Sequence, residues 1–216
     1  MAQSIHWETV NDLLKSGLEQ LMDEPLFAPF RLVGGTSLSL QLGHRISIDI
    51  DLFTDAPYGS IDFMEIDAYL RKSFNYVFPA ALPTIVGMGV SYIVGNSAED
   101  AFKLDLYYTD TFVRDAVEAG NIRMASLEEI AAMKMDIVQR KGRKKDFWDI
   151  HELSDTYSIS EMIGFHKQRY PHNHDEVLIR QNLTDFTGAD EDFDPECLKG
   201  KAWELVKLEI AELAFS

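Results

Sequence analysis

The sequence of 216 residues predicts an α+β protein, in which a small mixed sheet is followed by an all-helical part. Hydrophobic and polar residues alternate, as they do in β-strands, over residues 46–53 and 101–108. After about residue 115 the hydrophobic residues recur three and four positions apart, as they do in helices. With 46% hydrophobic and 26% charged residues, the composition is typical of a globular protein with a buried core.

The first part of the chain has signals for three helices and for the strands of the sheet. Thr36 and Ser37 are candidates for the N-cap of a short helix, and Gly43 would end it. The helices are predicted over 7–22, 36–42 and 61–74. The strands are predicted over 30–33, 46–53, 84–94 (one strand or two) and 101–108.

The second part of the chain reads as a series of helices. Ser126 and Glu129 have the spacing of a capping box, which predicts the start of a helix that Gly142 ends. A second helix is predicted over 144–157, and most of the remaining chain also reads as helical. We therefore divide the sequence into an α/β core, residues 1–115, and a helical C-terminal region, residues 116–216.

The composition favours a cytoplasmic protein with no membrane partner. Cys197 is the only cysteine, so no intrachain disulfide can form, as expected in a reducing compartment. No segment approaches the roughly 18 consecutive apolar residues that a membrane-spanning helix needs. The charged residues among the first 21 positions argue against a signal peptide.

The net charge of −16 results from 20 Lys and Arg against 36 Asp and Glu. A chain this acidic is a poor general binder of nucleic acid, whose affinity comes largely from cations that contact phosphates. Residues 134–149 are an exception, with six Lys or Arg against three Asp. This basic segment indicates either contact with an anion or a solvated helix face with a charged turn.

Two carboxylates, Asp49 and Asp51, lie two positions apart in the strand predicted over 46–53. Their side chains therefore share one face of the strand, about 7 Å apart. Such carboxylates repel each other unless a divalent cation lies between them, and Mg²⁺ commonly binds one or two carboxylates plus substrate phosphates. The alternative is an edge strand whose polar face is exposed to solvent and has no role in binding.

Asp105 can supply a third carboxylate, because it lies on the polar face of the strand predicted over 101–108. Metal-assisted phosphoryl and nucleotidyl transfer uses carboxylates arranged in this way. Lys103 lies on the same face as Asp105. Its ammonium group either reaches a phosphate or neutralises that carboxylate.

A phosphate-binding turn is predicted at residues 34–37, which read Gly-Gly-Thr-Ser between a short strand and a helix. Glycines allow backbone N–H groups to approach a phosphate, and a helix N-terminus favours an anion. The alternative is an ordinary turn. A short helix connects this turn to Asp49 and Asp51, so both features are predicted at one edge of the sheet.

Two segments of the chain resemble the AbiEii/AbiGii toxin family of nucleotidyltransferases, which belong to the DNA polymerase beta-like superfamily. The first segment, residues 34–53, reads GGTSLSLQLGHRISIDIDLF. The second, residues 132–150, is similar to a downstream family motif in which a helix lysine, here Lys134, precedes a basic-Asp-x-x-Asp helix start. The two segments frame residues 30–155.

The resemblance implies a minimal nucleotidyltransferase sheet with flanking helices, followed by a helical C-terminal half. It implies transfer of a nucleoside monophosphate from a nucleoside triphosphate to a hydroxyl of RNA, such as tRNA, or of protein. Mg²⁺, or alternatively Mn²⁺, would be the cofactor. The protein would be the toxin of a bacterial toxin–antitoxin or phage-exclusion system with a cognate antitoxin. The acidic composition is unhelpful for a tRNA acceptor and leaves protein or a small molecule open.

Carried over by position, the resemblance implies roles for individual residues. The triphosphate would be held by Gly34, Gly35, Thr36 or Ser37, and Lys134. The metal would be bound by Asp49, Asp51 and, with a role that varies across the superfamily, Asp105. Catalysis would depend on Asp49, Asp51, Lys134 and, as the late carboxylate, Asp146.

Two other functions stay open on the same residues. One is a catalytically idle module of this fold that binds nucleotide or a protein partner. The other is a phosphotransferase that differs only in which phosphorus is attacked. The presence of Asp49, Asp51 and Asp146 favours an active enzyme over the idle module.

Four further residues have a structural interpretation beside a functional one. His44 and Arg45 either steady the turn before the Asp49 strand or, for Arg45, contact the triphosphate. Phe147 and Trp148 are interpreted as core residues rather than as a platform for stacking bases.

Overall fold

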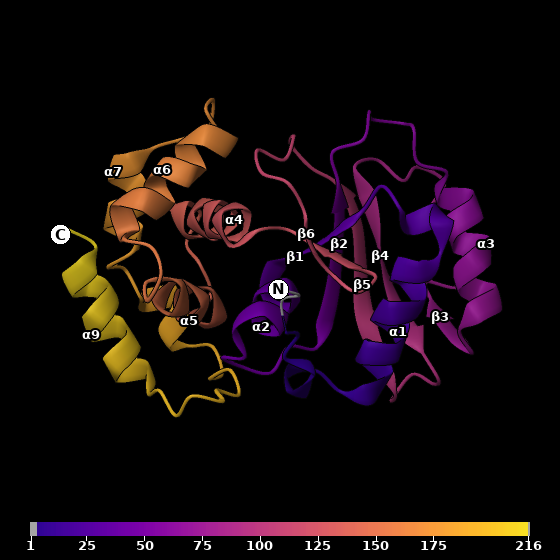
Figure 1. Ribbon diagram of the computed structural model, residues 1–216, viewed down its shortest axis with the longest axis horizontal. Helices are drawn as coiled ribbons and strands as arrows, with labels where there is room; N and C mark the ends of the chain where they lie inside the picture. Colours follow the sequence, from indigo (N-terminus) through magenta and orange to yellow (C-terminus); the bar gives the residue numbers. More distant parts are fainter. Residues whose placement is uncertain (1–3, 216) are drawn as a thin grey trace. The chain divides into compact units, whose positions relative to one another are not determined.

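The computed structural model describes residues 4–215, which fold into two compact units (Figure 1). Unit 1 contains residues 4–41, 47–111 and 116–124, and unit 2 contains residues 42–46, 112–115 and 125–215. The chain therefore enters unit 2 briefly at two places before it remains there from residue 125 onward.

Unit 1 is built around a mixed sheet that has seven strands in the described part of the chain, in the order β3-β4-β5-β2-β1-β7-β6. The pairs β2–β5 and β1–β7 are parallel and the other pairs are antiparallel. This confirms the predicted mixed sheet. The strands are β1 (Arg31–Val33), β2 (Asp49–Thr54), β3 (Tyr76–Phe78), β4 (Gly89–Gly95), β5 (Ala101–Tyr108), β6 (Val117–Ala119) and β7 (Ile122–Met124).

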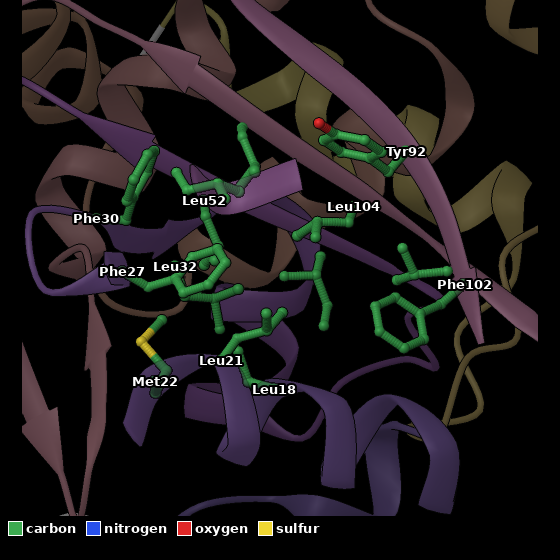
Figure 2. Close-up of a cluster of buried hydrophobic side chains, with 14 of the residues drawn as sticks. Leu18, Leu21, Met22, Phe27, Phe30, Leu32, Leu52, Tyr92, Phe102 and Leu104 are labelled. Carbon is green, nitrogen blue, oxygen red and sulfur yellow. The ribbon is translucent and has the colours of Figure 1, made fainter. Parts of the chain in front are cut away.

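The hydrophobic core of unit 1 lies between one face of this sheet and helices α1 (Asp12–Asp23) and α3 (Phe63–Ser73). Alternate residues of β2 and β5, such as Leu52 and Leu104, are fully buried on this face because a strand directs successive side chains to opposite sides. Figure 2 shows Leu18 and Leu21 of α1 in the same buried cluster as these strand residues. The charged residues of β2 and β5 therefore lie on the opposite face.

Three shorter helices complete unit 1. The helix α2 (Gly34–Leu42) follows β1, and the 3₁₀ helices η1 (Trp7–Thr9) and η2 (Pro25–Phe27) flank α1. Gly43, with φ +65°, ends α2, as the sequence predicted.

Unit 2 is helical, as predicted, and its core is rich in aromatic side chains. Trp148 stacks on Trp203 with ring centroids 6.1 Å apart, and Phe147 packs edge-on against Trp203. Both Phe147 and Trp148 are buried, which confirms their interpretation as core residues. The helices are α4 (Leu127–Gln139), α5 (Lys144–Leu153), α6 (Ile159–Arg169), α7 (Glu176–Asn182), α8 (Thr187–Asp190) and α9 (Trp203–Leu213).

Two predicted elements begin later than the sequence suggested. The helix predicted from residue 7 is interrupted at Val10, which is extended, and α1 starts only after Asn11 caps it by accepting a hydrogen bond from Leu14 N. The strand predicted from residue 46 starts at Asp49. The backbone N–H of Ile46 donates instead to Glu196 O, and Ile48 is 66% exposed.

The sheet is larger than the sequence indicated. The short strand β3 and the β6–β7 hairpin were not predicted, because three residues are too few to establish an alternation. The hairpin belongs to the sheet although it follows residue 115, where the sequence placed the boundary between regions. Residues 84–88, predicted as strand, precede β4 and contain a turn at Gly87.

Half of the predicted capping box at α4 is present. Ser126 accepts a hydrogen bond from Glu129 N, but the Glu129 carboxylate accepts hydrogen bonds from the backbone of Val113 and Arg114 and pairs with Arg169. None of the helices formed by residues 4–215 combines the length and apolar character needed to cross a membrane.

Candidate functional site

Four charged side chains lie side by side on the polar face of the sheet in unit 1. The parallel register of β2 and β5 pairs Asp49 with Lys103 and Asp51 with Asp105. Neighbouring strands are about 4.8 Å apart, so three carboxylates and one ammonium group leave the same face of two adjacent strands. We call this set the carboxylate face.

Lys103 and Asp105 form an ion pair on the carboxylate face. Lys103 Nζ lies 2.6 Å from Asp105 Oδ2. The hydrogen bond to Asp105 raises the pKa of Lys103, and the negative charges of Asp105, Asp51 and Asp49 raise it further. The sequence left two roles open for Lys103. In this structure Lys103 neutralises Asp105.

The second carboxylate oxygen of Asp105 has no hydrogen-bond partner among the residues that the structure describes, although the atom is buried. A buried oxygen without a partner is costly, and such atoms in native proteins commonly bind a water molecule or an ion. Asp105 Oδ1 therefore has the chemistry of a ligand for a cation or of an acceptor for a proton.

The N-terminus of α2 lies directly against Asp51. Gly34 has φ +68°, which favours glycine, and a Cβ atom at this position would overlap with Asp51 Oδ2. The positive end of the α2 dipole therefore lies next to the carboxylate face. Gly34 and Gly35 are partly exposed, so their backbone can approach a ligand.

The side chains of Thr36 and Ser37 point into the protein. Both are buried inside α2, which starts at Gly34, so the prediction that one of them is the N-cap is wrong. Thr36 Oγ1 lies 2.8 Å from Ser47 Oγ and donates to Asp49 O, and Ser37 Oγ accepts a hydrogen bond from Gln41. The backbone at Gly34 and Gly35 is the part of this turn suited to an anion.

Lys134 and Asp146 lie in unit 2, where α4 and α5 bring them together. Lys134 Nζ is 2.7 Å from Asp146 Oδ1 and 2.7 Å from Asp149 Oδ2, and all three side chains are buried. Burial lowers the pKa of Lys134, but the charges of Asp146 and Asp149 outweigh it and leave a raised pKa. Lys134 is therefore held as a cation.

Asp149 is the centre of this ion-pair network and was not singled out from the sequence. Its carboxylate accepts hydrogen bonds from Arg45 Nε and Nη2 at 2.7 and 2.9 Å, and His44 Nε2 lies 2.8 Å away. Burial raises the pKa of Asp149, but the charges of Arg45 and Lys134 hold it well below its ordinary range. The signal in the sequence was the spacing of Asp146 and Asp149 on one helix.

The network favours a structural role for His44 and Arg45, which fix the chain between α2 and β2 by binding Asp149. This was one of the two interpretations of the sequence. The backbone agrees, because Arg45 forms an isolated bridge with Cys197 and His44 O accepts a hydrogen bond from Leu198 N.

The three carboxylates predicted to bind metal do not form a complete metal-binding site by themselves. Within residues 4–215, no three side chains of Asp, Glu, His or Cys are gathered closely enough to enclose a metal ion. Asp105 is paired with Lys103 instead. The carboxylates Asp49 and Asp51 remain next to each other on β2.

Comparisons with solved structures support the fold. JHP933 from Helicobacter pylori superposes with a TM-score of 0.59 at 16% identity, covering 93% of this chain and 88% of that protein. A second structure from H. pylori, of a candidate nucleotidyltransferase, has a TM-score of 0.58 at 16% identity and covers 95% and 94% of the two chains. At this level of identity the similarity establishes the fold.

Sequence comparison establishes the family. The uncharacterized protein aq_aa25 of Aquifex aeolicus (strain VF5) is 27% identical over 186 residues, which cover 82% of this chain and 84% of that protein. The model of the nucleotidyl transferase AbiEii toxin family, described as a type IV toxin–antitoxin system, matches residues 17–205. The match includes the carboxylate face, the α2 turn and the ion-pair network, and the chain therefore belongs to the nucleotidyl transferase AbiEii toxin family.

Proposed function

We propose that this protein transfers a nucleoside monophosphate from a nucleoside triphosphate to an acceptor hydroxyl in a reaction that depends on a divalent cation. The observation that supports this most directly is the position of Gly34 against Asp51. It brings a helix N-terminus, which attracts phosphate, next to carboxylates, which attract a cation. Nucleotidyl transfer needs both at one place.

The residues of the carboxylate face fit Mg²⁺ or Mn²⁺. All of the candidate ligands are hard oxygen atoms, and Asp105 Oδ1 is buried without a hydrogen-bond partner in the described part of the chain. Asp49 and Asp51 would hold the cation, with the triphosphate supplying further oxygen ligands. When bound, the cation would withdraw charge from the phosphates and favour attack by the acceptor oxygen.

The chain's own groups account for the remaining steps. The N–H groups at the start of α2 would orient the triphosphate. The acceptor oxygen would form a bond to the α-phosphorus while the bond between the α-phosphorus and its bridging oxygen breaks, which releases pyrophosphate. Asp105 Oδ1 would accept the proton of the acceptor hydroxyl, because this atom has no competing hydrogen bond among the described residues.

Lys134 and Asp146 need a separate test, because they are buried and bonded to each other. The resemblance implies that Lys134 contacts the triphosphate and that Asp146 is catalytic. Lys134→Ala should weaken nucleotide binding if that role is correct. Nucleotide affinity that stays unchanged, in a variant whose melting temperature falls, would assign Lys134 to structural support alone.

The biological role that we propose is that of the toxin in a bacterial toxin–antitoxin or phage-exclusion system, with a cognate antitoxin as partner. The acceptor would be RNA, such as tRNA, or protein. Incubation with α-³²P-labelled nucleotides and either total RNA or cell protein separates these acceptors by which fraction is labelled. Label transferred from the γ-phosphate instead would indicate a phosphotransferase.

The decisive experiment is calorimetric titration with each of the four nucleoside triphosphates, with and without Mg²⁺. We expect Mg²⁺-dependent binding of one or more of them, which Asp51→Asn abolishes while the far-ultraviolet circular dichroism is unchanged. Glu118→Gln, which removes one negative charge from an exposed position on β6, is the matched control. No binding at millimolar concentration would favour the idle module that binds a protein partner.

A further inference from the structure

Lys103 occupies a position that the proposed reaction does not yet use. It lies opposite Asp49 in the β2–β5 register, and its ammonium group bonds to Asp105. Its side chain is 44% exposed, whereas that of Asp105 is 15% exposed. The ammonium group of Lys103 is therefore more accessible to solvent than the carboxylate of Asp105 to which it bonds.

An ammonium group and a divalent cation compete for the negative charge of the same three carboxylates, Asp49, Asp51 and Asp105. Their like charges repel strongly at the short distances of this face, so both cannot be held there at full strength. The lysine stem is long and flexible and its charge is compact, so Nζ can leave Asp105 without a change in the backbone. A triphosphate offers it a new anionic partner.

We propose that Lys103 is the resident counter-ion of the carboxylate face, and that it moves from Asp105 to the triphosphate when metal and nucleotide bind together. This inference rests on the proposed function. Lys103 then lowers the affinity of the carboxylate face for a metal ion alone. It does not lower the affinity for a metal ion that binds together with nucleotide. Metal and nucleotide therefore bind with positive coupling.

Removal of the charge of Lys103 changes the affinity for metal and the affinity for nucleotide in opposite directions. Lys103→Met keeps most of the side-chain length and eliminates the competing ammonium group, so the metal alone binds more tightly. The same variant has no cation to offer the triphosphate, so nucleotide binds more weakly. A lysine that only stabilises the sheet through a surface ion pair would shift neither affinity in this pattern.

The test measures Mn²⁺ binding in the absence of nucleotide, by the loss of the electron paramagnetic resonance signal of free Mn²⁺. We expect Lys103→Met to bind Mn²⁺ about tenfold more tightly than the wild type, as when one unit charge is removed close to a partly exposed site. Lys103→Arg retains the charge and should bind Mn²⁺ like the wild type. Lys72→Met, at an exposed position on α3, is the control for a general change in net charge.

The second measurement is calorimetric binding of the nucleoside triphosphates in the presence of Mg²⁺, where Lys103→Met should lose about tenfold in affinity. Equal Mn²⁺ affinities of Lys103→Met and the wild type would overturn the inference. So would Mn²⁺ binding that is absent from both proteins. The proposed function is judged separately, by whether the wild type binds nucleotide in a Mg²⁺-dependent manner.

Discussion

Gly34 shows how strongly the candidate site depends on a single position. Its φ of +68° is in the left-handed region, and Asp51 Oδ2 occupies the space that a side chain would need. Two constraints, one on the backbone and one on contact with a carboxylate, therefore apply to the same residue. The Gly-Gly pair predicted a close approach, but the sequence could not reveal that Asp51 is what lies against it.

We expect Gly34→Ala to lower the free energy of unfolding by about 1–2 kcal/mol from the backbone conformation alone. The variant should also displace Asp51 and weaken Mg²⁺-dependent nucleotide binding. Gly164→Ala is the control, because no atom outside its own helix lies near its Cβ position and alanine favours the helix. Urea denaturation and calorimetry check both effects. A Gly34→Ala variant with wild-type stability would contradict the role assigned to this glycine.

Asp149 links stability to pH because its pKa is held well below the ordinary value of 3.8. Burial opposes this shift, and the charges of Arg45 and Lys134 produce it. A carboxyl group with a lowered pKa stabilises the fold fully above its unfolded-state pKa. That contribution is lost as the pH falls below about 4 toward the folded-state pKa.

We expect Asp149→Asn to be about 3 kcal/mol less stable than the wild type at pH 7, because it leaves buried cations without their charged partner. Below pH 4 the difference should shrink, because the unfolded wild type then binds a proton at Asp149 that the folded protein does not yet bind. Urea denaturation between pH 7 and pH 2 measures this, with Glu118→Gln as a surface control. Curves for Asp149→Asn and wild type that stay parallel throughout would refute the linkage.

At the scale of elements, the position of β2 depends on hydrogen bonds that leave the sheet. Residues 46–48 continue the alternation that predicts a strand, yet the strand begins at Asp49. The N–H group of Ile46 bonds to Glu196 O and that of Ser47 bonds to Thr9 O. The alternation predicts the strand correctly from Asp49 onward. Before Asp49, hydrogen bonds to residues distant in sequence keep the chain out of the sheet.

The hydroxyl group of Thr36 connects α2 to the start of β2, because it bonds to Ser47 Oγ and to Asp49 O. We expect Thr36→Val, which keeps the shape and removes these bonds, to cost about 1–3 kcal/mol of stability. It should also weaken Mn²⁺ binding by loosening Asp49. Thr184→Val, at an exposed position after α7, is the matched control. Denaturation curves for Thr36→Val and Thr184→Val that coincide would show that the link contributes little.

At the scale of the whole molecule, the two units are interleaved along the chain. Unit 2 takes residues 42–46 and 112–115 from within the part of the sequence that otherwise forms unit 1. Each of these two segments is bound by a buried carboxylate of unit 2. Asp149 binds Arg45 in the first segment, and Glu129 binds the backbone of Val113 and Arg114 in the second. A single cut between the units therefore cannot separate two complete folds.

We expect a fragment of residues 125–216 to lack a cooperative unfolding transition, although it contains every named helix of unit 2. Asp149 and Glu129 would lose partners that the full chain supplies, which leaves buried charges without compensation. The fluorescence of Trp148 and Trp203 during urea denaturation reports this directly. A fragment with a sharp transition and buried tryptophans would show that the two inserted segments are dispensable.

The sequence by itself determined the α+β class, the helical character of the second half, the β5 strand, and the family. It also determined that Asp49 and Asp51 share one face of a strand. These properties follow from patterns within a few residues, since strand and helix periods and short motifs are local. Each could therefore be read without knowledge of which elements become neighbours.

Only the tertiary structure decided which partner each functional side chain has. It placed Lys103 and Asp105 beside Asp49 and Asp51, set Gly34 against Asp51, and made Asp149 the common partner of Lys134, Arg45 and His44. It also turned Thr36 and Ser37 inward. The physical reason is that strand order, register and helix packing bring together residues far apart in the chain, and no local pattern specifies those pairings.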